Sequence, residues 1–303
     1  MKKYKGIWPV VPTVFDDQGN LDLEGQKRTL DFLIDQKVDG ACILANYSEQ
    51  FSLSDEERNL LQKVCINHVA GRMPLIVTIS HFSTKIACER AKSALAEGAS
   101  IVMAMPPYHG TLLKGSPNQI LDHFKEMGDV GIPIMLQDAP LSGVPLSVPL
   151  LAELAQSIEM LELFKIESIG AAEKIYNLLK LADQHIEGPF DGEEGITLYA
   201  DLEAGATGSM TSALIPDLIR PVIISFLTGS KSSAREQYDA VLPIINHENR
   251  QCGFRATKEA MVEGGIITSS YCRHPIERLR PQARNLLMEL LKIHDPAVLS
   301  WGK

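Results

Sequence analysis

Cysteine is scarce in this chain, and no two cysteines stand close together. The 303 residues contain five cysteines and no C-x-x-C pair. Zinc ribbons and disulfide-rich secreted domains depend on closely spaced cysteines. The sequence therefore predicts neither a metal site nor a disulfide framework. It favours buried free thiols in a reducing, cytoplasmic setting.

Long apolar runs are also missing. The apolar stretch near the N-terminus is broken by Pro9 and Pro12 and stops at Asp16, which is too short for the apolar region of a signal peptide. The longest later stretch, over 214–228, contains prolines and charged residues. No run approaches the ~20 apolar residues that a membrane span needs, so we expect no association with a membrane.

Positive charge is in deficit. The chain has 38 acidic and 29 basic residues, and its formal net charge is −9. A protein that binds nucleic acid normally presents a basic face to the phosphate backbone. We therefore do not expect nucleic acid as a partner, and we expect a small-molecule ligand instead.

What the sequence does contain is a regular alternation of two kinds of segment. Eight short segments are apolar on nearly every residue, as parallel strands buried on both faces are. Longer segments with helical periodicity separate them, and one opens with the capping box Ser54-x-x-Glu57. We expect strands over 6–14, 40–45, 75–80, 101–106, 133–138, 161–167, 185–191 and 208–212, and helices over 22–36, 54–70, 83–97, 116–127, 147–157, 170–183, 194–204, 215–227, 231–246, 252–263 and 276–292.

This alternation predicts a (β/α)8 TIM barrel over 1–227, followed by a C-terminal helical extension over 228–303. An open doubly wound sheet is the alternative fold, but no G-x-G-x-x-G follows the first strand. Barrel enzymes carry their reactive groups at the C-terminal ends of the strands. The polar residues at those ends are Thr13, Asn46, Tyr47, Ser48, Glu49, Ser80, His81, Tyr108, His109, Gln137, Asp138, Lys165, Ser168, Asp191, Glu193, Glu194, Ser209 and Thr211.

Lys165 is the most informative of these residues, because it lies inside an apolar strand where a charged ammonium is costly to bury. One interpretation is structural, with the lysine paired to Glu167 or another carboxylate at the end of the strand. The other is chemical. Desolvation lowers the pKa of a buried amine, and a neutral amine can attack a ketone to form a Schiff base. The position in the sixth strand of a barrel favours the chemical interpretation.

Six short motifs follow one another at the strand ends. They are PTVFD (12–16), ANYSE (45–49), PPYH (106–109), LQDAP (136–140), FKIES (164–168) and GEE (192–194). In this order they resemble the dihydrodipicolinate synthase and N-acetylneuraminate lyase family of Schiff-base aldolases and dehydratases. The resemblance covers most of the chain. It implies that Lys165 forms the Schiff base, that Tyr108 is a catalytic tyrosine and that the ANYSE loop binds a carboxylate.

Two departures from the family pattern indicate a branch of the family. Gln137 stands where the family has a tyrosine that relays protons to the imine and the substrate. An arginine that lysine-biosynthetic members carry in the following loop is replaced near Ser142, which argues against dihydrodipicolinate synthase itself. Longer segments such as CILANYSEQF and VMAMPPYHG resemble dehydratases of 2-keto-3-deoxy sugar acids.

The resemblance and the side-chain chemistry together assign roles to the main candidates. Asn46, Tyr47 and Ser48 are expected to bind the substrate carboxylate, although turn and helix-cap hydrogen bonds explain Asn46 and Ser48 equally well. Tyr108 is expected to supply a proton or to orient a bound group. Gln137 can only form hydrogen bonds, because an amide does not exchange protons at neutral pH.

The remaining candidates are expected to line the substrate site. His81 suits acid–base chemistry near neutral pH, although a lone histidine is more often structural. Glu193 and Glu194 could bind sugar hydroxyls, or they could be acids in the first turn of a helix. Ser209 is expected to contact the substrate from the eighth strand.

An imine at Lys165 explains how a dehydration would proceed. Condensation with a ketone at C2 acidifies the C3 protons, and the resulting enamine can expel the C4 hydroxyl as water. An aldolase would instead break the C3–C4 bond, which requires a base at the C4 hydroxyl. We expect the dehydratase. The alternatives are an aldolase that releases pyruvate and a non-catalytic sugar-acid sensor on the same barrel.

No metal or other cofactor is expected for this chemistry, because the imine itself is the electron sink. The family resemblance implies a homotetramer.

Overall fold

The structure is a computed structural model that describes residues 2–110 and 112–303. The chain divides into two compact units. Unit 1 comprises Met1–Gly6 and Pro74–Met210, and unit 2 comprises Ile7–Met73 and Thr211–Lys303. Strand β1 (Gly6–Ile7) lies where the chain first passes from unit 1 into unit 2.

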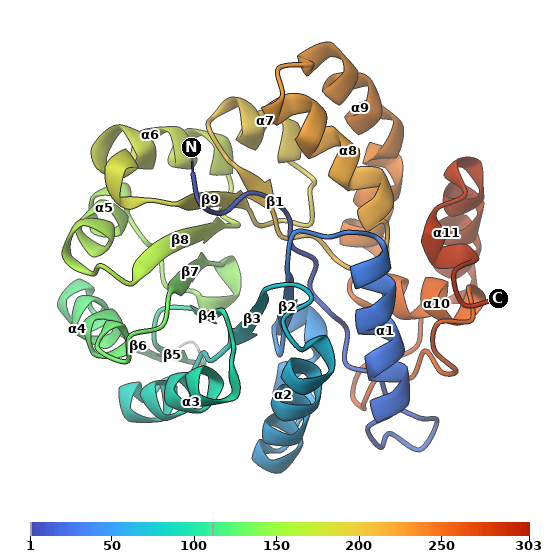
Figure 1. Cartoon of the computed structure of the whole chain (residues 1–303), viewed down its shortest axis with the longest axis horizontal. Helices are drawn as coiled ribbons and strands as arrows, with labels where there is room; N and C mark the ends of the chain where they lie inside the picture. The colour runs from blue at the N-terminus through green and yellow to red at the C-terminus, as the bar shows by residue number, and fades with distance from the viewer. Residues whose placement is uncertain (1, 111) are drawn as a thin grey trace. The chain divides into compact units, whose positions relative to one another are not determined.

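Unit 1 is a parallel sheet covered by helices. Its elements are β3 (Leu75–Thr78), α3 (Thr84–Glu97), β4 (Ile101–Ala104), β5 (Tyr108–His109), β6 (Leu113–Lys114), α4 (Pro117–Gly128), β7 (Ile134–Asp138), η3 (Pro140–Ser142), α5 (Val148–Ser157), β8 (Leu161–Ile166), α6 (Ala171–Ala182), η4 (Asp183–His185), β9 (Gly188–Asp191), α7 (Leu198–Glu203) and β10 (Gly208–Ser209). Six strands lie in the order β10-β9-β8-β7-β4-β3, and neighbouring strands are parallel. Helices α3 to α6 follow one another around the outside of these strands (Figure 1).

The apolar runs in the sequence explain the core of unit 1. Every residue of β4 and β7 is buried, as strands covered on both faces must be. The parallel direction brings the carboxyl ends of these strands to the same edge of the sheet. Polar residues at the ends of β7, β8 and β9 are therefore neighbours, although the loops and helices between them are long.

Unit 2 is mainly helical. Its elements are α1 (Leu23–Asp35), β2 (Ala41–Ile43), η1 (Asn46–Ser48), η2 (Gln50–Ser52), α2 (Asp55–Val69), α8 (Pro216–Leu227), α9 (Lys231–His247), η5 (Glu248–Cys252), α10 (Arg255–Glu263), α11 (Pro281–His294) and η6 (Ala297–Leu299). Val10 forms parallel bridges to Cys42 in β2 and to Ser212. The predicted capping box opens α2, which confirms that prediction.

The C-terminal helices of unit 2 are attached to α1. The guanidinium of Arg28 donates hydrogen bonds to the carbonyl oxygens of Gly265 at 2.8 Å and Ile266 at 2.9 Å. Trp301 donates its indole N–H to Asp35 at 2.9 Å. The predicted boundary at residue 227, between α8 and α9, remains a prediction.

Two strand predictions need correction. The first strand, expected over 6–14, is regular only at Gly6–Ile7, because Pro9 and Pro12 have no N–H to donate to a neighbour. The antiparallel hairpin of β5 and β6 was not expected. Each of its strands has only two residues, which is too short to produce the alternating pattern that predicts a strand.

Two helix predictions also need correction. The helix expected over 194–204 begins at Leu198, because the backbone of Glu194 is left-handed with φ of 54° and cannot continue a right-handed helix. The last helix, expected from residue 276, begins at Pro281, a residue suited to the first turn of a helix.

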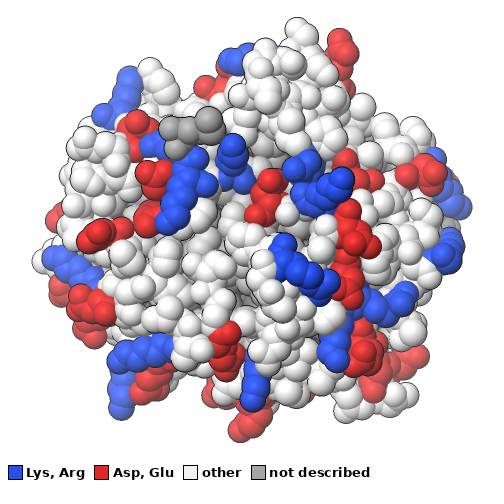
Figure 2. Space-filling view, in the orientation of Figure 1, with Lys and Arg blue, Asp and Glu red and all other residues white. Residues whose placement is uncertain are grey.

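The surface carries charges of both signs. Acidic and basic side chains are interspersed over the face drawn in Figure 2. Within residues 2–110 and 112–303, no helix is both long enough and apolar enough to cross a membrane.

Candidate active site

Lys165 lies in β8 with 3 % of its surface exposed. Its Nζ donates one hydrogen bond to a carboxylate oxygen of Glu167 and another, of 2.8 Å, to the carbonyl oxygen of Gly192. These acceptors offset the cost of burying the amine. Pairing with Glu167 was the structural interpretation of this lysine. The same pairing also places a proton acceptor next to the amine.

Gln137 joins this cluster from the neighbouring strand. It lies beside Lys165 in the register of β7 and β8, and its Nε2 donates a 2.7 Å hydrogen bond to the same oxygen of Glu167. Its amide oxygen is buried and has no hydrogen-bond partner among the described residues. A buried acceptor of this kind normally binds water or a ligand. The site therefore holds an acceptor that suits a substrate hydroxyl.

The sequence prediction considered Glu167 only as a salt-bridge partner and missed it as a functional residue. A signal for it was available. Side chains two residues apart on an extended strand point to the same side, so Glu167 was expected to lie beside Lys165. Its contact with Gln137 joins residues thirty positions apart and becomes visible only in the folded structure.

Gly192 allows the end of β9 to approach this cluster closely. A Cβ atom at this position would lie 2.7 Å from Cγ of Glu167, 2.8 Å from Cγ of Lys165 and 2.9 Å from the carbonyl oxygen of Ile166. Contacts below 3.0 Å require atoms to move. The missing side chain of Gly192 therefore makes room for the lysine and the carboxylate.

A second buried polar cluster lies at the ends of β9 and β10. Ser209 donates its hydroxyl to Asp191, and Thr197 donates a 2.7 Å hydrogen bond to Asp201. Burial and the nearby charge of Asp191 raise the pKa of Asp201 to about 8, and burial also raises the pKa of Asp191. One carboxyl of this pair therefore keeps its proton at neutral pH. The Ser209 hydroxyl is engaged with Asp191.

Tyr108 lies on β5 and His81 lies in the turn before α3, both in unit 1. Tyr108 is half-buried on the β5–β6 hairpin, and burial raises the pKa of its phenol, so the hydroxyl stays protonated and able to donate. Nδ1 of His81 accepts a 3.0 Å hydrogen bond from the backbone N–H of Ser83. This bond holds the ring in the turn before α3 and favours a structural role for that nitrogen.

Glu193 and Glu194 lie just beyond the end of β9, after Gly192. The helix after them begins only at Leu198, so the alternative that they are acids in its first turn is wrong.

The turn expected to bind a carboxylate is η1 of unit 2. Ser48 is buried and donates its hydroxyl to the carbonyl oxygen of Val11 at 2.6 Å, and Thr13 donates to the carbonyl oxygen of Ser48 at 2.6 Å. Asn46 accepts a 2.8 Å hydrogen bond from Gln50. These bonds shape the turn, as the alternative interpretation of Asn46 and Ser48 expected.

Tyr47, between those two residues, stacks edge-on against Phe254 with ring centroids 6.0 Å apart. In the described part of the chain, no three His, Cys, Asp or Glu side chains are grouped so that they could hold a metal ion.

A buried strand lysine that is hydrogen-bonded to a carboxylate able to take its proton is an arrangement that can form a Schiff base. The family model described as "Dihydrodipicolinate synthetase family" matches residues 3–294. The chain belongs to this family.

Individual relatives agree with this assignment. The chain is 50 % identical over 301 residues to an L-2-keto-3-deoxyarabonate dehydratase of Azospirillum brasilense, an alignment that covers 99 % of this chain and 97 % of that protein. It is 28 % identical to a 4-hydroxy-tetrahydrodipicolinate synthase of Caldicellulosiruptor bescii, over 96 % of this chain and 97 % of that one. The crystal structure of dihydrodipicolinate synthase from Rhodopseudomonas palustris matches with a TM-score of 0.87 and 26 % identity, over 95 % of this chain and 97 % of that chain.

These comparisons confirm the predicted fold class, a (β/α)8 barrel with C-terminal helices. They also confirm that the protein is an enzyme, a lyase of the class I aldolase and dehydratase type.

Proposed function

We propose that this protein removes water from L-2-keto-3-deoxyarabonate and forms 2-oxoglutarate semialdehyde (2,5-dioxopentanoate), a step in non-phosphorylative pentose breakdown. The observation that carries the proposal is the cluster of Lys165, Glu167 and Gln137, in which one carboxylate oxygen accepts hydrogen bonds from both the amine and the amide. The substrate is suggested by the dehydratase that is 50 % identical to this chain.

The first half of the reaction forms the imine. Glu167 takes a proton from the Lys165 ammonium, and the neutral amine attacks the C2 ketone. Protonated Glu167 then returns its proton to the hydroxyl of the resulting carbinolamine, which leaves as water, so that an iminium and a free carboxylate remain. The iminium withdraws electrons from C3, so the same carboxylate can remove a C3 proton and produce an enamine.

The second half of the reaction expels the C4 hydroxyl. Protonated Glu167 or the Tyr108 phenol gives a proton to this hydroxyl, which leaves as water. The unsaturation then shifts toward C5, which becomes the aldehyde carbon, and one water hydrolyses the imine and frees Lys165. The net change is the loss of one water. Gln137 supports this course by holding Glu167 and by offering its buried amide oxygen to a substrate hydroxyl.

The other predicted substrate contacts keep their roles within this proposal. The turn of Asn46, Tyr47 and Ser48 binds the C1 carboxylate, mainly through donors at the turn. His81, Glu193 and Ser209 line the remainder of the substrate site, with Ser209 acting through the oxygen of a hydroxyl that already donates to Asp191.

The cellular form of the enzyme is proposed to be a cytoplasmic homotetramer. The cysteines of the described residues are thiols outside any disulfide, and most are buried, which suits a reducing compartment. Leu112 and Phe82 expose 89 % and 40 % of their surfaces in unit 1, and exposed apolar side chains of this kind are suited to subunit contacts. Light scattering coupled to size-exclusion chromatography should give four times the mass of the chain.

The decisive test compares products. Purified enzyme is incubated with L-2-keto-3-deoxyarabonate, and the products are measured by NMR. We expect the semialdehyde to dominate, with little pyruvate and glycolaldehyde. If pyruvate and glycolaldehyde dominate, the protein is an aldolase.

A second test identifies the nucleophile. Borohydride with pyruvate should add one ligand mass at Lys165, and Lys165→Ala should abolish both trapping and turnover while the protein remains folded. Trapping at another lysine would contradict the proposed mechanism.

A further inference from the structure

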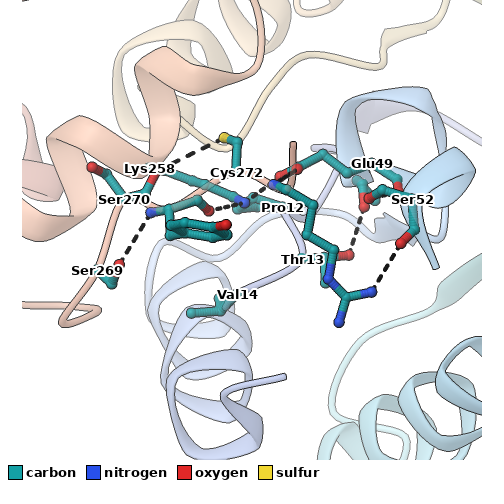
Figure 3. A network of polar contacts seen from close by, with 12 residues as sticks. Pro12, Thr13, Val14, Glu49, Ser52, Lys258, Ser269, Ser270 and Cys272 are labelled. Carbon is teal, nitrogen blue, oxygen red and sulfur yellow. Dashed lines mark hydrogen bonds and ion pairs between the residues drawn. The ribbon is translucent and has the colours of Figure 1, made fainter. Parts of the chain in front are cut away.

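A second buried lysine lies in unit 2. Lys258, on α10, has no exposed surface, and its Nζ donates hydrogen bonds to a carboxylate oxygen of Glu49 and to the carbonyl oxygen of Tyr271 at 2.9 Å. The ammonium also lies 4.7 Å from the centroid of the Phe15 ring. Glu49 is fully buried as well. Figure 3 shows Lys258 reaching toward Glu49 from the opposite side of this network.

Glu49 occupies a position in the chain that gives this ion pair influence over η1. It directly follows Ser48, and it separates η1 from η2 with a left-handed backbone, φ of 56°. A residue with a side chain rarely adopts this conformation. The buried carboxylate therefore fixes the end of the turn, and Lys258 is the cation that holds this carboxylate in place.

Arg273 also holds the Glu49 carboxylate in place. Its backbone N–H donates a 3.4 Å hydrogen bond to the second carboxylate oxygen of Glu49. Its guanidinium donates to the carbonyl oxygen of Ser52 in η2 at 2.8 Å and to Glu57 at 2.6 Å. Ser52 in turn donates its hydroxyl to the carbonyl oxygen of Glu49 at 2.8 Å (Figure 3). The C-terminal extension thus holds the chain on the C-terminal side of η1.

We propose that Lys258 is a positioning residue that fixes η1 in the conformation that binds the substrate carboxylate. This inference rests on the proposed function, which assigns that carboxylate to η1. If the ammonium is removed, the Glu49 carboxylate is left buried without its cation, which is strongly unfavourable. The carboxylate then moves toward water, and η1 moves with it because the two are adjacent in the chain.

The test separates carboxylate binding from the reactivity of Lys165. Two ketones are trapped with borohydride over a range of concentrations: pyruvate, which has a carboxylate, and hydroxyacetone, which has none. For Lys258→Met we expect half-saturation by pyruvate to rise about 10- to 100-fold, the loss expected when charged-group hydrogen bonds are misaligned. Trapping of hydroxyacetone should stay at the wild-type level, because this ketone has no carboxylate for η1 to bind.

Arg284→Met is the matched control. Arg284 forms an ion pair with Glu259 at 2.9 Å in the same C-terminal helices, and its loss should change neither trapping curve. The double variant Glu49→Gln with Lys258→Met leaves no buried charge, so it keeps the test usable if Lys258→Met folds poorly. The double variant also lacks the hydrogen bond from residue 258 that holds residue 49 at the end of η1, so we expect normal trapping of hydroxyacetone and weak trapping of pyruvate.

The outcomes that would overturn this inference are specific. If Lys258→Met loses trapping of both ketones equally, the ion pair serves stability alone. The same conclusion would follow if the double variant bound pyruvate as well as the wild type does. If the wild-type enzyme is trapped by neither ketone, the proposed function fails. Trapping of the wild type without a selective loss in either variant overturns only the role of Lys258.

Discussion

At the scale of single residues, the site depends on one carboxylate oxygen. That oxygen of Glu167 accepts hydrogen bonds from both the Lys165 amine and the Gln137 amide. A carboxylate in this position can receive the proton of the amine and later the C3 proton of the iminium. The two transfers can be measured separately, because borohydride trapping reports imine formation and kcat for dehydration also requires removal of the C3 proton.

Glu167→Gln should separate imine formation from elimination. The amide keeps the size and a hydrogen-bond acceptor, but it cannot take up the C3 proton. We expect kcat for dehydration to fall ~10²- to 10⁴-fold, the usual contribution of a general acid–base group. Borohydride trapping of pyruvate should persist at a reduced rate. Glu162→Gln is the control on the same strand, since Glu162 pairs with Lys3 at 3.0 Å and should leave kcat unchanged.

Gln137→Tyr should change the branch of the reaction. A phenol at this position adds a group that can exchange protons near the C4 hydroxyl, which C3–C4 cleavage requires. We expect the ratio of pyruvate to semialdehyde to rise, whatever happens to the total rate. Both products are measured under one set of conditions. An unchanged ratio in a folded, active variant would mean that residue 137 does not select the branch.

The residues differ in how far the sequence alone could identify them. The burial of Lys165 within a strand could be predicted, because a single charged side chain interrupts an apolar run. Gln137 could be located by its motif, but its bond to Glu167 could not be foreseen, because it depends on the register between β7 and β8. The role of Ser209 as a donor to Asp191 likewise depends on two strands meeting side by side.

At the scale of elements, close approach of strand ends assembles the cluster. β7 contributes the Gln137 amide, and β8 contributes the Lys165 amine. Gly192, the residue after β9, contributes its carbonyl oxygen. Apolar runs predicted these strands because burial on both faces leaves an unambiguous pattern. The β5–β6 hairpin that carries Tyr108 could not be predicted, because each of its strands is only two residues long.

Gly192→Ala tests the requirement for close approach. The added Cβ would lie 2.7 Å from Cγ of Glu167 and 2.8 Å from Cγ of Lys165, so those side chains must move apart. We expect the rate of pyruvate trapping to fall about tenfold, with a loss of stability of about 1–3 kcal/mol from overpacking. Gly229→Ala is a control for stability, because its backbone is left-handed with φ of 90°. It should lower stability without changing the trapping rate.

At the scale of the whole molecule, protonated buried carboxyls tie stability to pH. Burial raises the pKa of Asp201 to about 8 and the pKa of Glu248 to about 7. In the unfolded chain these groups lose their protons near 3.8 and 4.5. The stability that their protonated forms contribute is complete below those values, and it is lost as pH rises toward 7 and 8. The folded enzyme should therefore be more stable at mildly acidic than at mildly alkaline pH.

Asp201→Asn should remove one proton from this dependence. The amide cannot ionise, and it keeps a donor beside Asp191, the neighbour whose charge contributes to the raised pKa of Asp201. One proton held by the folded state and not by the unfolded state changes the free energy of unfolding by ~1.4 kcal/mol per pH unit. Wild-type stability should fall more steeply than that of the variant between about pH 6 and about pH 7.5.

Glu248 titrates in both proteins, so its effect cancels in the difference. Urea unfolding followed by tryptophan fluorescence measures both slopes. Parallel slopes would mean that Asp201 is ionised in the folded enzyme at neutral pH, and the proton would then have to reside on Asp191.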